Sequence, residues 1–178
     1  MAMRLMSGLP ARVIQVLKDY LPAELDLIDA EEIDGITTPD IAAADYYEYD
    51  RKAIPEFPAC TIRTVSSLPV EIKPDGFGRW ADVFHRLDVM LHATLAQEAT
   101  PSAPDQLQKL MHRYVAGAIR VLCVMKEALQ TSADPTRFVT ICEWVGEASY
   151  GPEEDQDEGV VVRTATLPIR IRRIEQRG

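Results

Sequence analysis

The sequence has few of the features that would support a metal site, a disulfide framework or a membrane span. Its three cysteines, Cys60, Cys123 and Cys142, are odd in number and far apart, which fits neither disulfides nor a paired-cysteine zinc site. Its apolar runs, such as 121–125, end after a few residues, whereas a transmembrane helix needs about 20. Residues 1–7 lead into an amphipathic pattern that is unlike a signal peptide. We therefore expect a soluble protein with reduced thiols and with no cofactor or metal.

Familiar catalytic motifs are also missing. The sequence contains no GxSxG elbow, no GxxxxGKS/T phosphate loop and no GxGxxG turn. His85 and His92 are seven residues apart in a strand-like segment, so we expect them on opposite faces of a sheet and not on one metal ion. These absences predict that the protein is not an enzyme. The alternative is a small enzyme whose site is assembled from dispersed residues, namely His85, Asp88, His112 and Cys142.

Basic residues are in the minority. The chain has 19 Lys and Arg against 28 Asp and Glu, a formal net charge of -9. A negative total disfavours binding to a phosphate backbone, so we expect no sequence-specific nucleic-acid partner and, without an apolar span, no membrane partner. Residues 1–58 hold 12 acidic and 5 basic side chains, residues 150–158 hold five acidic ones, and residues 159–178 hold five arginines. This grouping predicts patches of opposite sign on one molecule.

Hydrophobic periodicity defines the predicted elements of a single domain, residues 1–178. Leu107, Leu110, Met111 and Tyr114 follow the spacing of an amphipathic helix, whereas residues 80–93 alternate as a strand does. In chain order we expect a helix over 9–21 ended by Pro22, a short strand or extended arm over 24–29, a long acidic connection over about 30–58, a strand over 59–65, a turn-rich connection to Gly78, a strand over 80–93, a helix over 105–129, a strand over 138–145, an acidic loop over 150–158 and a strand over 160–174.

This order predicts an α+β fold. We expect a mostly antiparallel mixed sheet of about four to five strands, packed by an N-terminal helix and one long central helix. Pro168 marks the last strand as an edge strand or as the site of a bulge.

Several segments together carry a likeness to a known family. They are an N-terminal amphipathic helix ahead of a short strand, the proline-led strand PEFPACTIR at 55–63, the long strand ADVFHRLDVMLHA at 81–93, a helix, a further strand, and the closing strand GVVVRTATLPIRI at 159–171. This pattern resembles the tail terminator and related neck or tail-completion proteins of tailed bacteriophages. The resemblance covers nearly the whole chain, although no single motif within it is diagnostic.

The resemblance implies a structural virion protein that forms a homohexameric ring at the head-proximal end of a phage tail. Such a ring stops polymerisation of the tail tube and joins the tail to the head. The implied partners are other copies of the chain, the tail-tube protein and the head-tail connector proteins. The implied location is the virion, and the host cytoplasm during assembly. The family has no catalytic residues, and the sequence leaves open whether the ring completes the tail or the head.

A ring of this kind needs an interface in which one patch meets a different patch. We expect the acidic loop of one subunit to approach the C-terminal arginines of the next. The candidate interface residues are Glu153, Glu154, Asp155, Asp157, Glu158, Arg170, Arg172 and Arg173. The alternative function is an acidic inhibitor or DNA mimic that binds a basic partner protein, which the net charge favours and the clustered arginines oppose.

Overall fold

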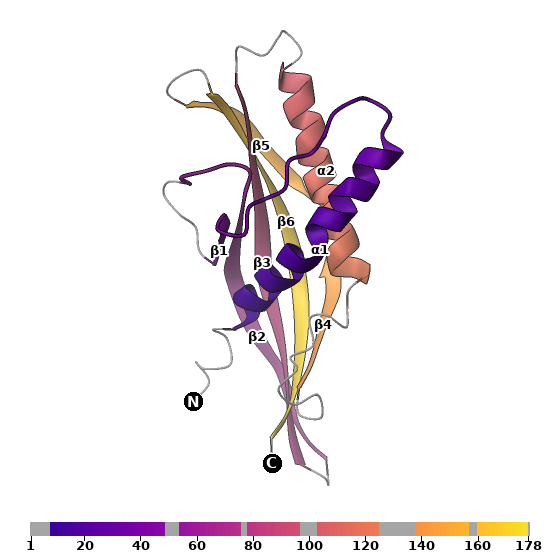
Figure 1. Ribbon diagram of the computed structural model, residues 1–178. Coiled ribbons are helices and arrows are strands. Elements are labelled where there is room, and N and C mark those ends of the chain that lie inside the picture. Colours follow the sequence, from indigo (N-terminus) through magenta and orange to yellow (C-terminus); the bar gives the residue numbers. More distant parts are fainter. Residues whose placement is uncertain are drawn as a thin grey trace.

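The protein is a curled sheet with both helices on one face, as seen in a computed structural model that describes residues 8–48, 54–75, 78–96, 103–124, 138–156 and 160–177 (Figure 1). The elements are α1 (Leu9–Glu31), β1 (Tyr46–Tyr47), β2 (Ala59–Asp75), β3 (Gly78–Ala96), α2 (Ala103–Val124), β4 (Phe138–Val145), β5 (Ser149–Gln156) and β6 (Val160–Arg177). The predicted α+β class is confirmed, with six strands in place of four to five. The strands continue past the region that the helices cover, toward the β2–β3 hairpin (Figure 1).

The six strands lie in the order β1-β2-β3-β6-β4, and β5 also pairs with β6. The β1–β2 pair is parallel, and the other strand pairs are antiparallel. The sheet is therefore mixed but mostly antiparallel, as predicted.

Helix α1 continues through Pro22, so the predicted end at this proline and the predicted strand over 24–29 are both wrong. A proline inside a helix loses a backbone hydrogen bond and costs about 3 kcal/mol. Leu21, Leu25 and Ile28 carry the apolar stripe beyond it and are at most 5% exposed. Burial of each such side chain contributes about 1.5–3 kcal/mol. Packing of the stripe therefore outweighs the proline.

Helix α2 confirms the predicted central helix as far as residue 124, and residues 125–129 of that prediction lie outside the described residues. It meets α1 at Gly117, where an added Cβ would lie 2.8 Å from Cδ1 of Leu21 and 3.2 Å from Cδ2 of Leu25. Glycine thus permits the close approach of the two helices. Within the described residues, neither helix combines the length and hydropathy that crossing a bilayer requires.

Strands β2 and β3 form a long hairpin where a turn-rich connection was predicted. β2 runs to Asp75 and β3 begins at Gly78, so most of that expected connection is strand. On its outer side β2 pairs with the two residues of β1, and beyond Thr61 it has no outer partner among the described residues. A sheet tolerates proline on such an edge, because the N–H that proline lacks is not needed by a neighbouring strand. Pro69 and Pro74 therefore fit within β2.

Strands β4 and β5 follow one another along the same side of β6. The predicted acidic loop over 150–158 is wrong for its first seven residues, which belong to β5; residues 157–159 are outside the described part. β6 has partners on both sides, so it is not the edge strand that Pro168 suggested, and the register shifts lie in its partners.

Pro168 occupies a central strand because of the gap between β4 and β5. The N–H of Gly146, in this gap, donates to the carbonyl oxygen of Pro168 at 2.7 Å. The nitrogen and oxygen of one strand residue point to the same side, so the nitrogen of Pro168 also faces the gap. No ladder hydrogen bond is lost there.

The core lies between the helices and the sheet. Leu87, Val89 and Leu91 of β3 and Leu167 and Ile169 of β6 face the helices and are fully buried. Alternate residues point to the other side of the sheet. This second side, the open face, carries Thr61, Arg63, Phe84, Arg86, Asp88, His92, Thr164, Arg170 and Arg172.

Candidate functional site

The residues of the dispersed-enzyme alternative do not form one site. His85 and Cys142 both face the helices, but Ile171 of β6 lies between them in register. They are therefore two strand spacings apart, about 10 Å. Nδ1 of His85 instead lies 2.9 Å from the Ser67 hydroxyl. No direct proton transfer between His85 and Cys142 is possible in this arrangement.

The other two residues of that alternative lie elsewhere. Asp88 is on the open face, where its Oδ2 lies 2.9 Å from Nη2 of Arg63. His112 is exposed on α2, and its ring packs edge-on against Tyr150 of β5 with 5.0 Å between centroids. The four candidates are thus distributed over both faces of the sheet and one helix.

His92 lies on the face opposite to His85, as their spacing predicts. Its Nε2 is 3.0 Å from the Thr61 hydroxyl and its Nδ1 is 2.9 Å from the Thr164 hydroxyl. The ring therefore links β2, β3 and β6, and it is 9% exposed. In the described part of the chain, no group of three His, Cys, Asp or Glu side chains is arranged to hold a metal ion.

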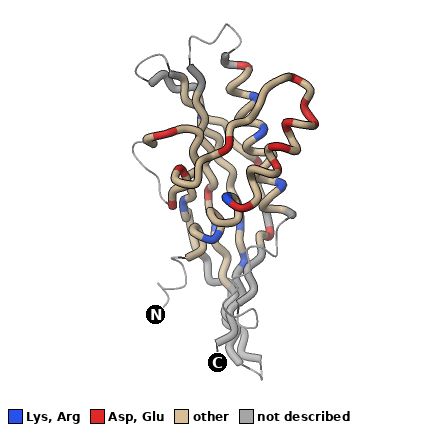
Figure 2. The backbone as a smooth tube through the Cα atoms, viewed as in Figure 1, with Lys and Arg blue, Asp and Glu red and all other residues tan. Residues whose placement is uncertain are grey.

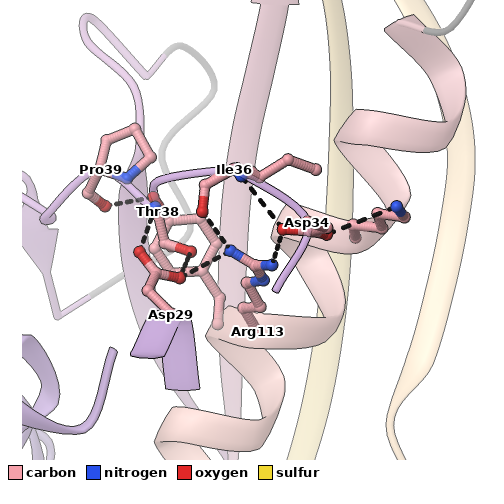
Figure 3. Close-up of polar contacts among 8 residues, drawn as sticks. Asp29, Asp34, Ile36, Thr38, Pro39 and Arg113 are labelled. Carbon is pink, nitrogen blue, oxygen red and sulfur yellow. Dashed lines mark hydrogen bonds and ion pairs between the residues drawn. The ribbon is translucent and has the colours of Figure 1, made fainter. Parts of the chain in front are cut away.

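Arg113 of α2 joins the end of α1 to the segment that follows it (Figure 3). Its Nη1 lies 2.7 Å from Oδ1 of Asp29 and 2.7 Å from the carbonyl oxygen of Ile36, and its Nη2 lies 2.5 Å from Oδ1 of Asp34. Asp29 also accepts hydrogen bonds from the backbone N–H and the hydroxyl of Thr38, both at 2.6 Å. The Arg113 side chain is 5% exposed. A buried arginine thus holds a surface segment at several points.

We call residues 32–38 the clamped loop. Beyond its end, the hydroxyl of Tyr114 donates to the carbonyl oxygen of Pro39. Within it, Gly35 has a φ of 73°, a left-handed conformation that favours glycine. Ile33 lies in the same loop with a fully exposed side chain (101%). The chain therefore fixes this loop firmly while presenting a large apolar side chain to solvent.

The clamp keeps its two carboxyl groups ionised. Burial raises the pKa of Asp29, but hydrogen bonds from Thr38 and the charge of Arg113 outweigh burial and leave the pKa below its usual value. The backbone N–H of Ile36 lowers the pKa of Asp34, and Arg113 adds to this effect. Both ion pairs are therefore intact near neutral pH.

Carboxylates are numerous along α1 and the clamped loop, where Figure 2 shows a run of acidic positions. Residues 8–48 contain ten acidic and two basic side chains. Arg120 of α2 neutralises one of these acids, since its Nη2 lies 2.7 Å from Oε2 of Glu31 and lowers the pKa of that carboxyl. Asp26 and Glu32 are exposed and pair with no basic side chain among the described residues. The helix layer is thus the acidic side of the molecule.

A groove of about 450 Å³ lies between the clamped loop and α2. Its lining includes Asp34, Lys109 and His112. Nζ of Lys109 lies 3.4 Å from Oδ2 of Asp34, so the two charges offset one another. The groove thus offers polar contacts of both signs.

Arginines gather around Phe84 on the open face. The guanidinium carbons of Arg170 and Arg172 lie 5.2 Å and 5.7 Å from the ring centroid, within cation–π range. Glu143 of β4 lies 3.4 Å from Arg170 and 3.5 Å from Arg172. Arg86 lies directly opposite Arg170 in the β3–β6 register, and like charges in that position destabilise a sheet. We call Phe84, Arg86, Arg170 and Arg172 the Phe84 patch.

No family model matches this chain, and no curated protein sequence matches it.

The predicted acidic half of the interface lies at the β5–β6 hairpin. Glu153, Glu154 and Asp155 are on β5, with backbones paired to residues 161–163 of β6. Asp157 and Glu158 lie outside the described residues. Within one chain, the strand that carries these acids therefore lies beside the first residues of β6.

The predicted basic half lies further along β6. Arg170 and Arg172 belong to the Phe84 patch, and the backbone of Arg173 pairs with Val83 and Thr140. The acidic and basic halves are thus apart within one subunit. A contact between them across two subunits stays a prediction.

The sequence did not predict the clamp or the role of Phe84. A charged residue close to the apolar stripe of a helix, as Arg113 is beside Met111 and Tyr114, signals a buried partner. The identity of that partner depends on a contact between residues 84 positions apart, which periodicity does not reveal. Phe84 similarly falls in an alternating strand pattern that does not say which side chains flank it.

Proposed function

We propose that the protein is a structural virion protein that forms a six-membered ring at the head-proximal end of a phage tail. There it stops polymerisation of the tail tube and joins the tail to the head. The observation that carries this proposal is the opposite charge of its two layers. The segment 8–48, which contains α1 and the clamped loop, has ten acidic and two basic side chains, whereas the open face carries the arginines of the Phe84 patch.

Unlike surfaces on one subunit suit a ring. In a closed ring each subunit presents one patch to the neighbour on one side and a different patch to the neighbour on the other. Because the two surfaces lie on opposite faces of the sheet, a two-fold dimer cannot bring each surface onto the other, whereas a head-to-tail arrangement can.

The edges of the sheet are poorly suited to joining subunits by strand pairing. Pro69 and Pro74 interrupt the donors of β2, and its register shifts between Thr64 and Ser66. Pro152 lies within β5 on the other edge. Such prolines and bulges block edge-to-edge pairing. Contacts between the faces of neighbouring subunits are therefore the more suitable basis for a ring.

The phage-tail part of the proposal rests on the resemblance of the sequence pattern. The first helix, the strands over 59–65 and 80–93, the second helix and the closing strands follow the order of that resemblance, whereas the short strand expected over 24–29 is part of α1. On this proposal the ring contacts the tail-tube protein on one side and head-tail connector proteins on the other. The acidic-inhibitor alternative has less support, because Asp29, Glu31 and Asp34 are already bound by arginines of the same chain.

Negative-stain electron microscopy of the purified chain tests the proposal. We expect closed rings of six subunits at low ionic strength, where charge attraction between subunits is least screened. Particles that stay monomeric at every protein and salt concentration, or that form two-fold dimers, would contradict the ring.

A further inference from the structure

We propose that Ile33 of one subunit packs on the Phe84 patch of a second copy of this chain, with exposed acids beside Ile33 pairing with Arg86 and Arg170. This inference rests on the proposed ring and identifies the two surfaces that form its interface. Four observations lead to it.

The first observation is the combination of rigidity and exposure in the clamped loop. Arg113, buried on α2, fixes the loop through Asp34 and the carbonyl oxygen of Ile36. Ile33 is nevertheless fully exposed. A large apolar side chain on a preorganised loop loses little conformational freedom on binding, so its burial by a partner translates efficiently into affinity. Such a residue has the properties of an interface anchor.

The second observation concerns the surroundings of Ile33. Leu27, in the last turns of α1, is a second large apolar side chain that is exposed, at 54%. Asp26 and Glu32 are exposed and, in the described part of the chain, pair with no basic side chain. Glu31 differs, because it is held by Arg120. Ile33 therefore forms an apolar knob, and its sequence neighbour Glu32 gives it an acidic rim that is available to a basic partner.

The third observation is the excess of positive charge in the Phe84 patch. Arg86 and Arg170 are directly opposed across two strands and both are exposed. Among the residues that the structure describes, one carboxylate, Glu143, lies near Arg170 and Arg172. Like charges held face to face cost stability, and an incoming carboxylate would relieve that cost. The aromatic ring beneath them supplies an apolar contact, so the patch matches an apolar knob with an acidic rim.

The fourth observation is the placement of the two surfaces. The clamped loop follows α1 on the helix side of the sheet (Figure 1). The residues of the Phe84 patch alternate along β3 and β6 with buried residues such as Leu87 and Ile169, so the patch lies on the opposite face of the sheet. One chain cannot bring them together, so the contact forms between copies. Each copy then uses a different surface toward each neighbour, which is the head-to-tail geometry of a ring.

Charge and knob variants test this interface by sedimentation velocity and native mass spectrometry. Ile33→Asp removes the knob at a fully exposed position, and Ala44→Asp is the matched control, since it adds the same charge at another exposed position of the same connection. We expect Ile33→Asp to raise the subunit dissociation constant about tenfold or more, as loss of an interface anchor does, and Ala44→Asp to leave it within about twofold.

A charge exchange provides the second arm. Glu32→Arg alone and Arg86→Glu alone are each expected to weaken assembly. The double variant Glu32→Arg/Arg86→Glu is expected to recover most of it, because every interface of the oligomer then has both charges exchanged. Recovery in the double variant requires that the two residues meet, which a general loss of folding would not produce.

The outcomes separate this inference from the ring itself. If wild-type rings form and Ile33→Asp assembles as well as Ala44→Asp, the interface proposed here is wrong while the ring remains. If the double charge variant assembles no better than the single variants, the pairing of Glu32 with Arg86 is wrong. If the wild-type chain does not associate under any condition, both the interface and the ring are overturned.

Discussion

Replacing Arg113 with methionine is expected to release the clamped loop and to destabilise the protein. Methionine keeps an unbranched side chain of similar length but removes the donors to Asp29, Asp34 and the Ile36 carbonyl oxygen. Removing one partner of a buried ion pair costs about 3–5 kcal/mol. Asp29 and Asp34 retain side-chain exposures of 17% and 21%, so water can rehydrate them in part. We therefore expect a loss near the lower end of that range, about 3 kcal/mol.

Urea unfolding followed by circular dichroism measures this loss, and amide hydrogen exchange locates it. The backbone N–H groups of Ile36 and Thr38 donate hydrogen bonds to Asp34 and Asp29, which protects them from exchange. Both N–H groups should therefore exchange faster in Arg113→Met. Arg120→Met is the matched control, because it removes a partly exposed arginine from the same helix and breaks one ion pair, with Glu31. The free energy of unfolding and the exchange rates of the control are expected to stay close to those of wild type.

The pH dependence supplies an independent check on the clamp. The pKa values of Asp29 and Asp34 are lower in the folded chain than their usual values. Groups of this kind stabilise the fold above their unfolded pKa, and the stabilisation is lost as the pH falls through the folded pKa. Wild type should therefore lose stability below about pH 4, and Arg113→Met should lose less over the same interval. An Arg113→Met protein within about 0.5 kcal/mol of wild type, or with an unchanged acid profile, would refute this reasoning.

Three further changes test the packing of the fold. Gly117→Ala is expected to lower the free energy of unfolding by about 1 kcal/mol, because overpacking against α1 costs about 1–3 kcal/mol and the higher helix propensity of alanine offsets about 1 kcal/mol. A variant more stable than wild type in chemical denaturation would show that α1 moves to accommodate the added methyl group. Pro168→Ala is expected to change stability by less than about 0.5 kcal/mol, since its new N–H faces the gap between β4 and β5; a gain above about 1 kcal/mol would indicate a restored ladder bond. Burial raises the pKa of Cys60 to about 12, whereas Cys123 is exposed. Iodoacetamide at mildly alkaline pH should therefore modify Cys123 first, as followed by mass spectrometry, and early modification of Cys60 would contradict its burial.

Elements with a strong period were predictable, because their side chains meet the core in a regular pattern. The central helix and the strands over 80–93 and 138–145 are of this type, and the structure places them where the periodicity does. Helix α1 was predicted too short because Pro22 is a local signal for a helix end, whereas burial of Leu25 and Ile28 against α2 is a tertiary contribution.

Strand β5 was missed for a related reason. Its sequence SYGPEEDQ has the glycine, proline and charge typical of a loop, and pairing with β6 is what makes it a strand. The candidate surfaces were even less accessible to sequence reasoning. The clamp joins Asp29 and Arg113, and the Phe84 patch joins side chains of β3 and β6. Contacts of this range depend on the fold and not on any local pattern.

Native mass spectrometry of the wild-type chain at two ionic strengths tests the central claim most directly. At about 0.05 M salt, where attraction between opposite charges extends furthest, the account predicts a species of six copies of the 19.9 kDa chain. At about 0.5 M salt the same species should dissociate toward monomers, because the charges of the two faces are then screened. A monomer at both ionic strengths, or a dimer that is indifferent to salt, would contradict a ring joined by oppositely charged faces.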